Sequence, residues 1–247
     1  MHISSKNMAN PYFQFKQFTV YHDKSAMKVT TDACFFGAWC AEEIAHLSIE
    51  KTRLLDIGAG TGLLSLMIAQ KNRLNIDAVE IDKSAAMQAK ENIAASPWFQ
   101  QIKVHNENIL QFDMNRNYDL IVSNPPFYEN ELSSARQAKK IAHHSEELKM
   151  AEVFDIVNQG LTENGIFFLL LPFKREAELE TMTAKNNLHI NKKLLLQPSI
   201  KHKPTRIMIM GSRKKGKASI QTIPIRDEKD EYTPGFKKML KDYYLYL

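Results

Sequence analysis

The sequence lacks the features that mark membrane, secreted and fibrous proteins. Its longest apolar run covers Ile166 to Leu171, far short of the roughly 18 residues that a membrane span requires. The first twenty residues contain no continuous apolar segment, so they do not form a signal peptide. Nine glycines and nine prolines are too few for a fibrous or low-complexity chain. We therefore expect a soluble, cytoplasmic protein with no membrane partner.

Cysteine is also scarce. The only two, Cys34 and Cys40, cannot frame a disulfide scaffold, and their spacing matches no usual zinc pattern. The adjacent His143 and His144 have no cysteine or carboxylate partner at ligand spacing, so we expect no metal site. Both cysteines and Trp39 are expected to be buried residues of a helix.

The charge of the chain is small and unevenly distributed. The 247 residues are 44% hydrophobic and 25% charged, as in globular proteins, and the net charge is +5. Residues 1–135 hold 12 basic and 15 acidic residues, whereas residues 136–247 hold 21 and 13, so the net charges are −3 and +8. A basic half favours a polyanionic partner such as nucleic acid, although solvated lysines on ordinary helices are a commoner cause of such an excess.

Short apolar runs alternate with helical segments through the middle of the chain, which predicts a mostly parallel sheet with helices on both faces. The predicted strands cover residues 54–57, 76–81, 102–105, 118–123 and 165–171, followed by an antiparallel hairpin of 188–197 and 205–212. We expect seven strands, with the hairpin at the edge of the sheet. No linker divides the chain, so we expect a single domain. Its parts are an N-terminal extension and covering helix (1–50), a cofactor-binding and catalytic core (51–172), and the hairpin with a C-terminal tail (173–247).

A glycine-rich loop follows the first of these strands. Gly58, Gly60 and Gly62 are spaced as G-x-G-x-G, whereas the dinucleotide fingerprint is G-x-G-x-x-G. Glu80, at the end of the next strand, can accept hydrogen bonds from both hydroxyls of a ribose. Without a diphosphate to bind, Asp56 is free to lie beside a cationic group. S-adenosylmethionine, an adenosine that carries an amino acid, fits these features; the alternative is an ordinary βα turn followed by a surface glutamate.

The segment Asn124-Pro125-Pro126-Phe127 follows the fourth strand, at the sheet edge where ligands bind in this architecture. Prolines fix φ and remove donors, which leaves carbonyl groups that only accept hydrogen bonds. Together with the side-chain oxygen of Asn124, these acceptors can bind both hydrogens of a planar amino group and free the nitrogen lone pair to attack a methyl sulfonium. Phe127 can stack on the ring that bears the amine. A proline-rich turn with a buried phenylalanine is the alternative.

These motifs resemble the class I, Rossmann-like S-adenosylmethionine-dependent methyltransferases that modify exocyclic amines. The segments 13–18, 25–33 and 240–247 are similar to the bacterial methyltransferases of valine tRNA, so the resemblance extends over nearly the whole chain. It implies methylation of the amino group of the adenine immediately 3′ of the anticodon, with S-adenosylhomocysteine as product. The segment 140–145 departs from the family, which has Arg and Glu where this chain has His143 and Ser145.

The resemblance also implies roles for individual residues. Lys28 and Thr31 would lie near the methionine moiety and Glu80 at the ribose. Asn108 would lie at the adenine, with Ile81 and Ile109 as its apolar neighbours. Basic residues that can hold tRNA phosphates are Arg136, Lys140 and His144, close to the catalytic segment, and Lys201, Lys203 and Arg206, near the hairpin turn; solvated loops are the alternative.

Other functions remain open at this point. The same chemistry can act on guanine in ribosomal RNA or on a glutamine side chain in a protein, and a noncatalytic RNA-binding protein can keep the fold. DNA methylation is disfavoured, because the chain has no separate target-reading domain. We expect a monomer that acts on tRNA.

Overall fold

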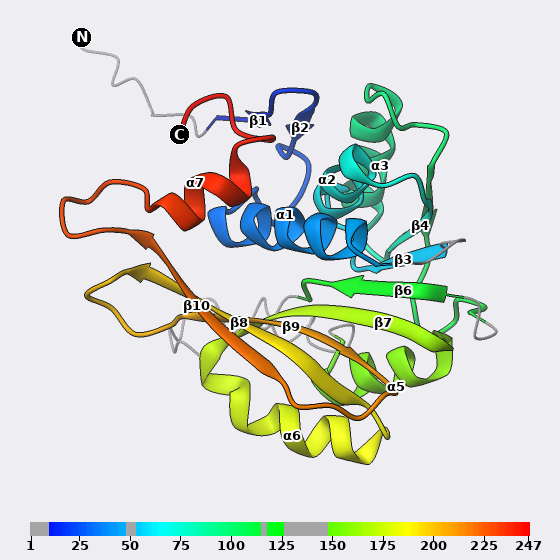
Figure 1. The fold of residues 1–247 in the computed structure, drawn as a ribbon. Coiled ribbons are helices and arrows are strands. Elements are labelled where there is room, and N and C mark those ends of the chain that lie inside the picture. Colours follow the sequence, from blue (N-terminus) through cyan, green and yellow to red (C-terminus); the bar gives the residue numbers. More distant parts are fainter. Residues whose placement is uncertain (1–9, 48–52, 115–117, 126–147) are drawn as a thin grey trace, which may run out of the picture.

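The computed structural model describes residues 10–47, 53–114, 118–125 and 148–247. Within them, eight strands form one sheet in the order β10-β8-β9-β7-β6-β3-β4-β5 (Figure 1). Strands β3 to β7 are parallel to one another, β9 is antiparallel to both β7 and β8, and β10 is parallel to β8. The strands are β3 (Arg53–Ile57), β4 (Asn75–Glu80), β5 (Ile102–Asn106), β6 (Tyr118–Ser123), β7 (Leu161–Pro172), β8 (His189–Ser199), β9 (Arg206–Ser212) and β10 (Ser219–Arg226).

The expected Rossmann-like fold class is confirmed, and the sheet has one strand more than the seven we expected. The extra strand is β10, which lies outside β8, so the antiparallel hairpin of β8 and β9 is not at the edge of the sheet. Nothing in the apolar pattern marks β10, because its first four residues are exposed. Pro224 also argues against a strand in the middle of a sheet, but an edge strand tolerates proline.

Helices cover both faces of the sheet (Figure 1). Phe167 and Phe168 are consecutive residues of β7, and they belong to different core clusters because successive side chains of a strand point to opposite faces. The cluster of Phe168 includes Trp39, Cys34 and Cys40, all buried in a helix as expected. The helices are α1 (Thr31–Ala45), α2 (Leu63–Lys71), α3 (Lys83–Ala94), α5 (Met150–Gly160), α6 (Glu176–Lys185) and α7 (Pro234–Leu240), with a 3-10 turn, η1 (Phe173–Arg175).

The order of the parallel strands reverses direction at β3. The chain continues from β3 to β4 and β5 on one side, and returns to β6 and β7 on the other. In open α/β sheets, ligands bind beyond the carboxyl ends of the strands at such a reversal. The topology therefore directs attention to the residues that follow β3, β4 and β6.

A second, two-stranded sheet of β1 (Tyr12–Gln14) and β2 (Thr19–Tyr21) joins the two ends of the described chain. Phe15 forms an isolated antiparallel bridge with Tyr244, and the Lys16 ammonium donates to the carbonyl of Lys241. Figure 1 accordingly shows the first and last described segments side by side.

The described residues include no helix with both the length and the apolar character of a membrane span. They also contain no group of three or more His, Cys, Asp and Glu side chains that could hold a metal ion.

Candidate active site at the carboxyl edge of the sheet

The glycine loop between β3 and α2 has a backbone that requires glycine. Gly58, Gly60 and Gly62 have φ values of 69°, 56° and 81°, a region that other residues rarely adopt. A Cβ atom added to Gly58 or Gly60 would meet nothing within 4 Å, whereas one added to Gly62 would lie 3.3 Å from the side chain of Ile93. The first two glycines therefore border open space, and the third allows close packing of the loop against α3.

Glu80 is the last residue of β4 and is 9% exposed. Its carboxylate binds the backbone of the glycine loop and of the loop before α3. The amide of Gly60 donates to its Oε2 and the amide of Asp82 to its Oε1, each at 2.8 Å. Burial raises the pKa of Glu80, and these two hydrogen bonds oppose that effect. A carboxylate has about four lone-pair sites, so both oxygens can still accept a further hydrogen bond.

Asp56 lies near the end of β3 and is completely buried. The Ser65 hydroxyl donates to its Oδ2 at 2.7 Å, while Oδ1 has no hydrogen-bond partner among the described residues. Burial raises the pKa of Asp56 to about 6; the hydrogen bonds from Ser65 lower it and the nearby Glu80 raises it. A cationic group near this carboxylate would favour its charged form.

The register of the sheet aligns the predicted site residues in one row. Ile57 of β3 is level with Val79 of β4 and with Ser123 of β6, so the residues that come next, Gly58, Glu80 and Asn124, are neighbours. The Ser123 hydroxyl donates to the carbonyl of Ile57 at 2.8 Å and ties the two strand ends together. Since strands lie about 4.8 Å apart, the backbones of Glu80 and Asn124 are about 10 Å apart.

Asn124 and Pro125 are the described part of the predicted catalytic segment. Asn124 is half-buried and Pro125 is buried, directly after the carboxyl end of β6. Pro126 and Phe127 lie outside the described residues, as do the predicted nucleic-acid residues Arg136, Lys140 and His144 and the adjacent His143.

The loops after β4 and β5 adjoin this row. The side-chain amide of Asn106 donates to the carbonyls of Glu80 and Ile81, each at 3.0 Å. Asn108 accepts a hydrogen bond from the amide of Leu110 through its side-chain oxygen, which shapes the turn. Ile81 is 43% exposed and Ile109 is buried, so of these two isoleucines only Ile81 presents an apolar surface.

One buried amide attaches the N-terminal segment to the glycine loop. Asn92 of α3 is 2% exposed and donates to the carbonyls of Tyr21 and Thr61, each at 2.9 Å. Its oxygen accepts from the amide of Tyr21 at 3.0 Å. Lys28, which follows in the same segment, is exposed. The position of this segment is thus fixed relative to the loop of Gly60 through a residue outside the sequence motifs.

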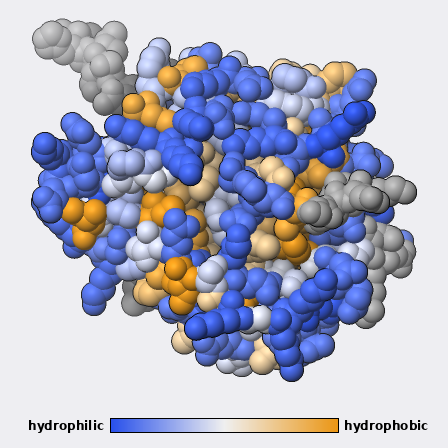
Figure 2. Space-filling view, viewed as in Figure 1, coloured by the Kyte–Doolittle hydropathy of each residue, from blue (hydrophilic) through white to orange (hydrophobic). Residues whose placement is uncertain are grey.

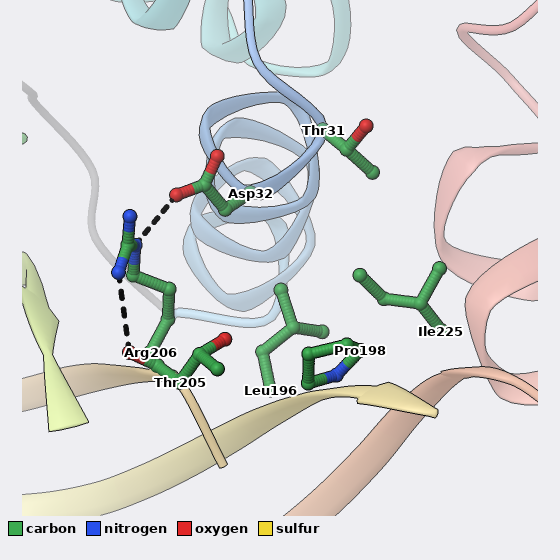
Figure 3. A pocket seen from close by; sticks show the side chains of 7 residues that line it. All are labelled: Thr31, Asp32, Leu196, Pro198, Thr205, Arg206 and Ile225. Carbon is green, nitrogen blue, oxygen red and sulfur yellow. Dashed lines mark hydrogen bonds and ion pairs between the residues drawn. The ribbon is translucent and has the colours of Figure 1, made fainter. Parts of the chain in front are cut away.

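Thr31 does not lie in the row of Glu80, Gly58 and Asn124. It lines a cavity that Arg206 also lines (Figure 3). The cavity has a volume of about 380 Å³ and lies between the first turn of α1 and the strands β8, β9 and β10. Arg206 donates from Nε to the carboxylate of Asp32 at 2.7 Å, so this arginine is ion-paired rather than free for a phosphate. The structure thus groups one predicted cofactor residue with one predicted nucleic-acid residue.

Basic residues lie at both ends of the hairpin: a first cluster, Lys201 and Lys203, in its turn, and a second, Arg213, Lys214 and Lys215, after β9. Lys201 and Lys203 are exposed in the turn between β8 and β9, at the carboxyl edge that also carries Asn124. Arg213 follows β9 at the other edge, where its guanidinium donates to the side chain and the carbonyl of Asn158 at the end of α5. Only the first cluster therefore lies on the side of the candidate active site.

Sequence reasoning missed the residues that support the site without belonging to a motif. Asn106, Asn92 and Ser65 act on the site through side-chain hydrogen bonds. Asp82 alone carried a sequence signal: it is the N-cap of α3 and accepts from the amide of Ala85 at 2.7 Å, as an aspartate before a helix often does.

Comparisons with known proteins find relatives similar in sequence and structures similar in fold. A family model described as "methyltransferase small domain" matches residues 42–162. Proteins from Parabacteroides distasonis and Bacteroides thetaiotaomicron, both named tRNA1(Val) (adenine(37)-N6)-methyltransferase, are 38% and 37% identical to the chain. The matches cover 96% and 97% of this chain and 99% and 100% of those proteins.

Among solved structures, the chain is similar in fold to a ribosomal protein L11 methylase from Lactobacillus delbrueckii subsp. bulgaricus, with a TM-score of 0.55 and 18% identity over 79% of this chain and 84% of that one. The glycopeptide N-methyltransferase MtfA in complex with S-adenosyl-L-methionine gives a TM-score of 0.53 and 11% identity over 72% of this chain and 94% of that one. Both likenesses concern the fold.

Proposed function

The chain belongs to the tRNA1(Val) (adenine(37)-N6)-methyltransferase family, and from this premise we propose that it methylates the exocyclic amino group of the adenine immediately 3′ of the anticodon in tRNA1(Val). The methyl donor is S-adenosylmethionine and the other product is S-adenosylhomocysteine. The observation that carries the proposal is the row of Glu80, Gly58 and Asn124 across three neighbouring strand ends.

The residues of this row fit the proposed donor. The lone pairs of the Glu80 carboxylate suit the two ribose hydroxyls, and the open space at Gly58 and Gly60 lets a ligand approach the backbone. Among the described residues Oδ1 of Asp56 has no hydrogen-bond partner, and a cationic amino acid would offset this buried negative charge. S-adenosylmethionine, when bound, supplies a methyl group on a positively charged sulfur. Lys28, Ile81, Asn108 and Ile109 are further candidates for contact with it, whereas Thr31 lies at the cavity of Arg206.

Asn124 and Pro125 are proposed to orient the amino group of the target adenine. The side-chain oxygen of Asn124 and the carbonyl of Pro125 each accept one N–H, which draws the nitrogen toward tetrahedral geometry and exposes its lone pair. These hydrogen bonds strengthen as positive charge develops on the nitrogen, so they lower the barrier more than they tighten binding. An adenine stacked in the anticodon loop must unstack to reach them, and Phe127 is proposed to stack on it.

The tRNA is proposed to lie along the carboxyl edge of the sheet. Lys201 and Lys203 are exposed there and can contact phosphates, as can Arg136, Lys140 and His144. We further propose that the protein acts as a monomer in the cytoplasm, where tRNA is modified.

The test is to incubate the protein with S-adenosylmethionine and an unmodified tRNA1(Val) transcript, digest the RNA and identify the methylated nucleoside and its position by mass spectrometry. Asn124→Ala is expected to lower kcat by about 10²–10³-fold, because one preorganised hydrogen-bond partner of the transition state is lost. Asn75→Ala is the matched control, since Asn75 is exposed at the opposite end of β4.

N6-methyladenosine 3′ of the anticodon, lost with Asn124→Ala and retained with Asn75→Ala, would support both the reaction and the role of Asn124. Binding of S-adenosylmethionine without methylation of any tRNA would overturn the proposal, and ribosomal RNA and glutamine-containing proteins would then be tested as substrates.

A further inference from the structure

We propose that the cavity at the first turn of α1 binds the base of a nucleotide that neighbours the target adenine in the tRNA. This inference rests on the proposed function, because it takes tRNA as the substrate. It assigns the cavity a role that is separate from methyl transfer at Asn124, namely recognition of the sequence around the target.

The cavity combines an apolar floor with polar walls, as a nucleobase combines apolar faces with a polar edge. Leu196, Pro198 and Ile225 form the apolar part, from β8 and β10, and the hydroxyl-bearing Thr31 and Thr205 lie on opposite sides (Figure 3). Its volume of about 380 Å³ falls within the range of small-molecule sites. In Figure 2, apolar patches interrupt the hydrophilic surface along β10.

The polar wall supplies donors and acceptors side by side. Arg206 uses Nε toward Asp32 and one terminal nitrogen toward the carbonyl of Thr205. The guanidinium has five N–H groups and the carboxylate has several lone pairs, so both keep hydrogen-bonding capacity. Their side chains are 37% and 24% exposed, and the charges of the pair cancel. A neutral pair of this kind favours the edge of a base over a phosphate group.

The cavity lies within reach of a nucleotide next to the target. Arg206 is level with Pro172 of β7, three residues beyond Leu169, and Leu169 is level with Ser123 of β6. Strand spacing and rise per residue then place the backbones of Arg206 and Asn124 about 12 Å apart. Stacked nucleotides rise only about 3.4 Å each, so a neighbour of the target reaches the cavity only when it leaves the stack.

Positive charge adjoins the cavity at the turn between β8 and β9. Lys201 and Lys203 are exposed there, and Pro204 separates Lys203 from Thr205 and Arg206 in the sequence. The turn projects from the carboxyl edge of the sheet, on the same side as the first turn of α1 (Figure 1). These lysines can hold the phosphates of an RNA strand whose base enters the cavity.

The experiment uses Thr205→Phe, which fills the cavity from an exposed position, and the matched control Thr222→Phe on the outer strand β10, where Thr222 is also exposed. The probe is the anticodon stem-loop of tRNA1(Val) with 2-aminopurine in place of either neighbour of the target adenine. Its fluorescence rises when the base unstacks. We also measure KM for tRNA and for S-adenosylmethionine with the full transcript.

With the wild-type protein, fluorescence is expected to rise at one of the two neighbours. Thr205→Phe is expected to abolish that rise and to increase KM for tRNA about tenfold, with KM for S-adenosylmethionine unchanged, whereas Thr222→Phe behaves as wild type. If Thr205→Phe does not fold, Ile225→Trp fills the cavity from the other side.

No rise at either neighbour, or equal effects of the two phenylalanine variants, would overturn the assignment of the cavity. Methylation of the transcript by the wild-type protein is measured in parallel. If the transcript is methylated but the cavity variants give these results, the assignment of the cavity fails and the proposed function stands.

Discussion

The carboxyl edge of the sheet contains two regions that handle charge in opposite ways. At the ends of β3 and β4, the charges are carboxylates, Asp56 and Glu80, and both are buried. Between the end of β8 and the start of β9, the cations Lys201 and Lys203 are exposed, and Arg206 is neutralised by Asp32. Enclosed negative charge favours a small ligand that carries a positive charge, whereas exposed positive charge favours a large, flexible polyanion.

One sheet edge can therefore bind two very different ligands. Burial strengthens the electrostatic interactions of Asp56 and Glu80, whereas water and salt screen those of the exposed lysines. Three changes test this view. They alter Asp56, Glu80 and the pair Lys201 and Lys203 in turn.

The largest effect is expected from the pH dependence of stability at Asp56. Its pKa is raised by burial to about 6 from 3.8, so the folded state binds the proton more tightly than the unfolded chain. Stability therefore falls as pH rises through this window, by about 3 kcal/mol in total. Asp56→Asn removes the titration, so its free energy of unfolding relative to wild type is expected to increase between pH 4 and pH 7.5.

Urea titrations at several pH values measure this difference. Parallel stability curves of wild type and Asp56→Asn would show that the buried carboxylate carries no such penalty. Ser65→Ala sharpens the test, because loss of the hydroxyl that donates to Asp56 is expected to move the window to higher pH.

The next effect concerns Glu80. Glu80→Gln replaces one carboxylate oxygen by an NH₂ group, which cannot accept the hydrogen bond that the amide of Gly60 or Asp82 donates. The change also leaves a weaker acceptor for the ribose hydroxyls. The affinity for S-adenosylmethionine, measured by calorimetry, is expected to fall 10- to 100-fold, with tRNA affinity unchanged. Glu107→Gln, a change at an exposed glutamate beyond β5, is the matched control. Equal losses in the two variants would contradict a specific role of Glu80.

The smallest effect is expected from the exposed lysines. The double change Lys201→Gln and Lys203→Gln should lower tRNA affinity several-fold and flatten the dependence of log K on log salt by about 1.4–1.8. The same double change at Lys214 and Lys215, which are exposed at the opposite edge, should leave both quantities unchanged. Filter binding at several salt concentrations distinguishes the two, and identical slopes for both variants would remove the distinction between the edges.

The cofactor region could be read from the sequence because its parts are local. The glycines, Glu80 and Asn124 each follow directly after a strand, and the parallel register brings such positions together. The same logic predicted the Rossmann-like class and the bounds of most core strands. The hydrogen bonds of Asn92 to Tyr21 and Thr61 could not be predicted, because in the sequence Asn92 looks like any other polar residue of a helix.

The other region could not be read in this way. Its cavity combines Thr31 and Asp32 with residues of β8, β9 and β10, which lie more than 150 positions later in the sequence. β10 itself has exposed residues and an internal proline, so neither apolar periodicity nor composition indicated a strand. Without β10, the sequence pattern puts the hairpin at the edge of the sheet and leaves out the wall that contains Ile225.

The contact between the two ends of the described chain has a consequence for biosynthesis. Phe15 is buried against Phe13, Phe18 and Tyr244, and Lys16 donates to Lys241, 225 positions away. A ribosome makes Phe15 long before Tyr244, so Phe15 lacks this partner until translation reaches Tyr244. Domains that complete their cores only through such distant pairings expose apolar surface while they are made. The aromatic cluster of Phe13, Phe15, Phe18 and Tyr244 therefore packs only after Tyr244 has been made.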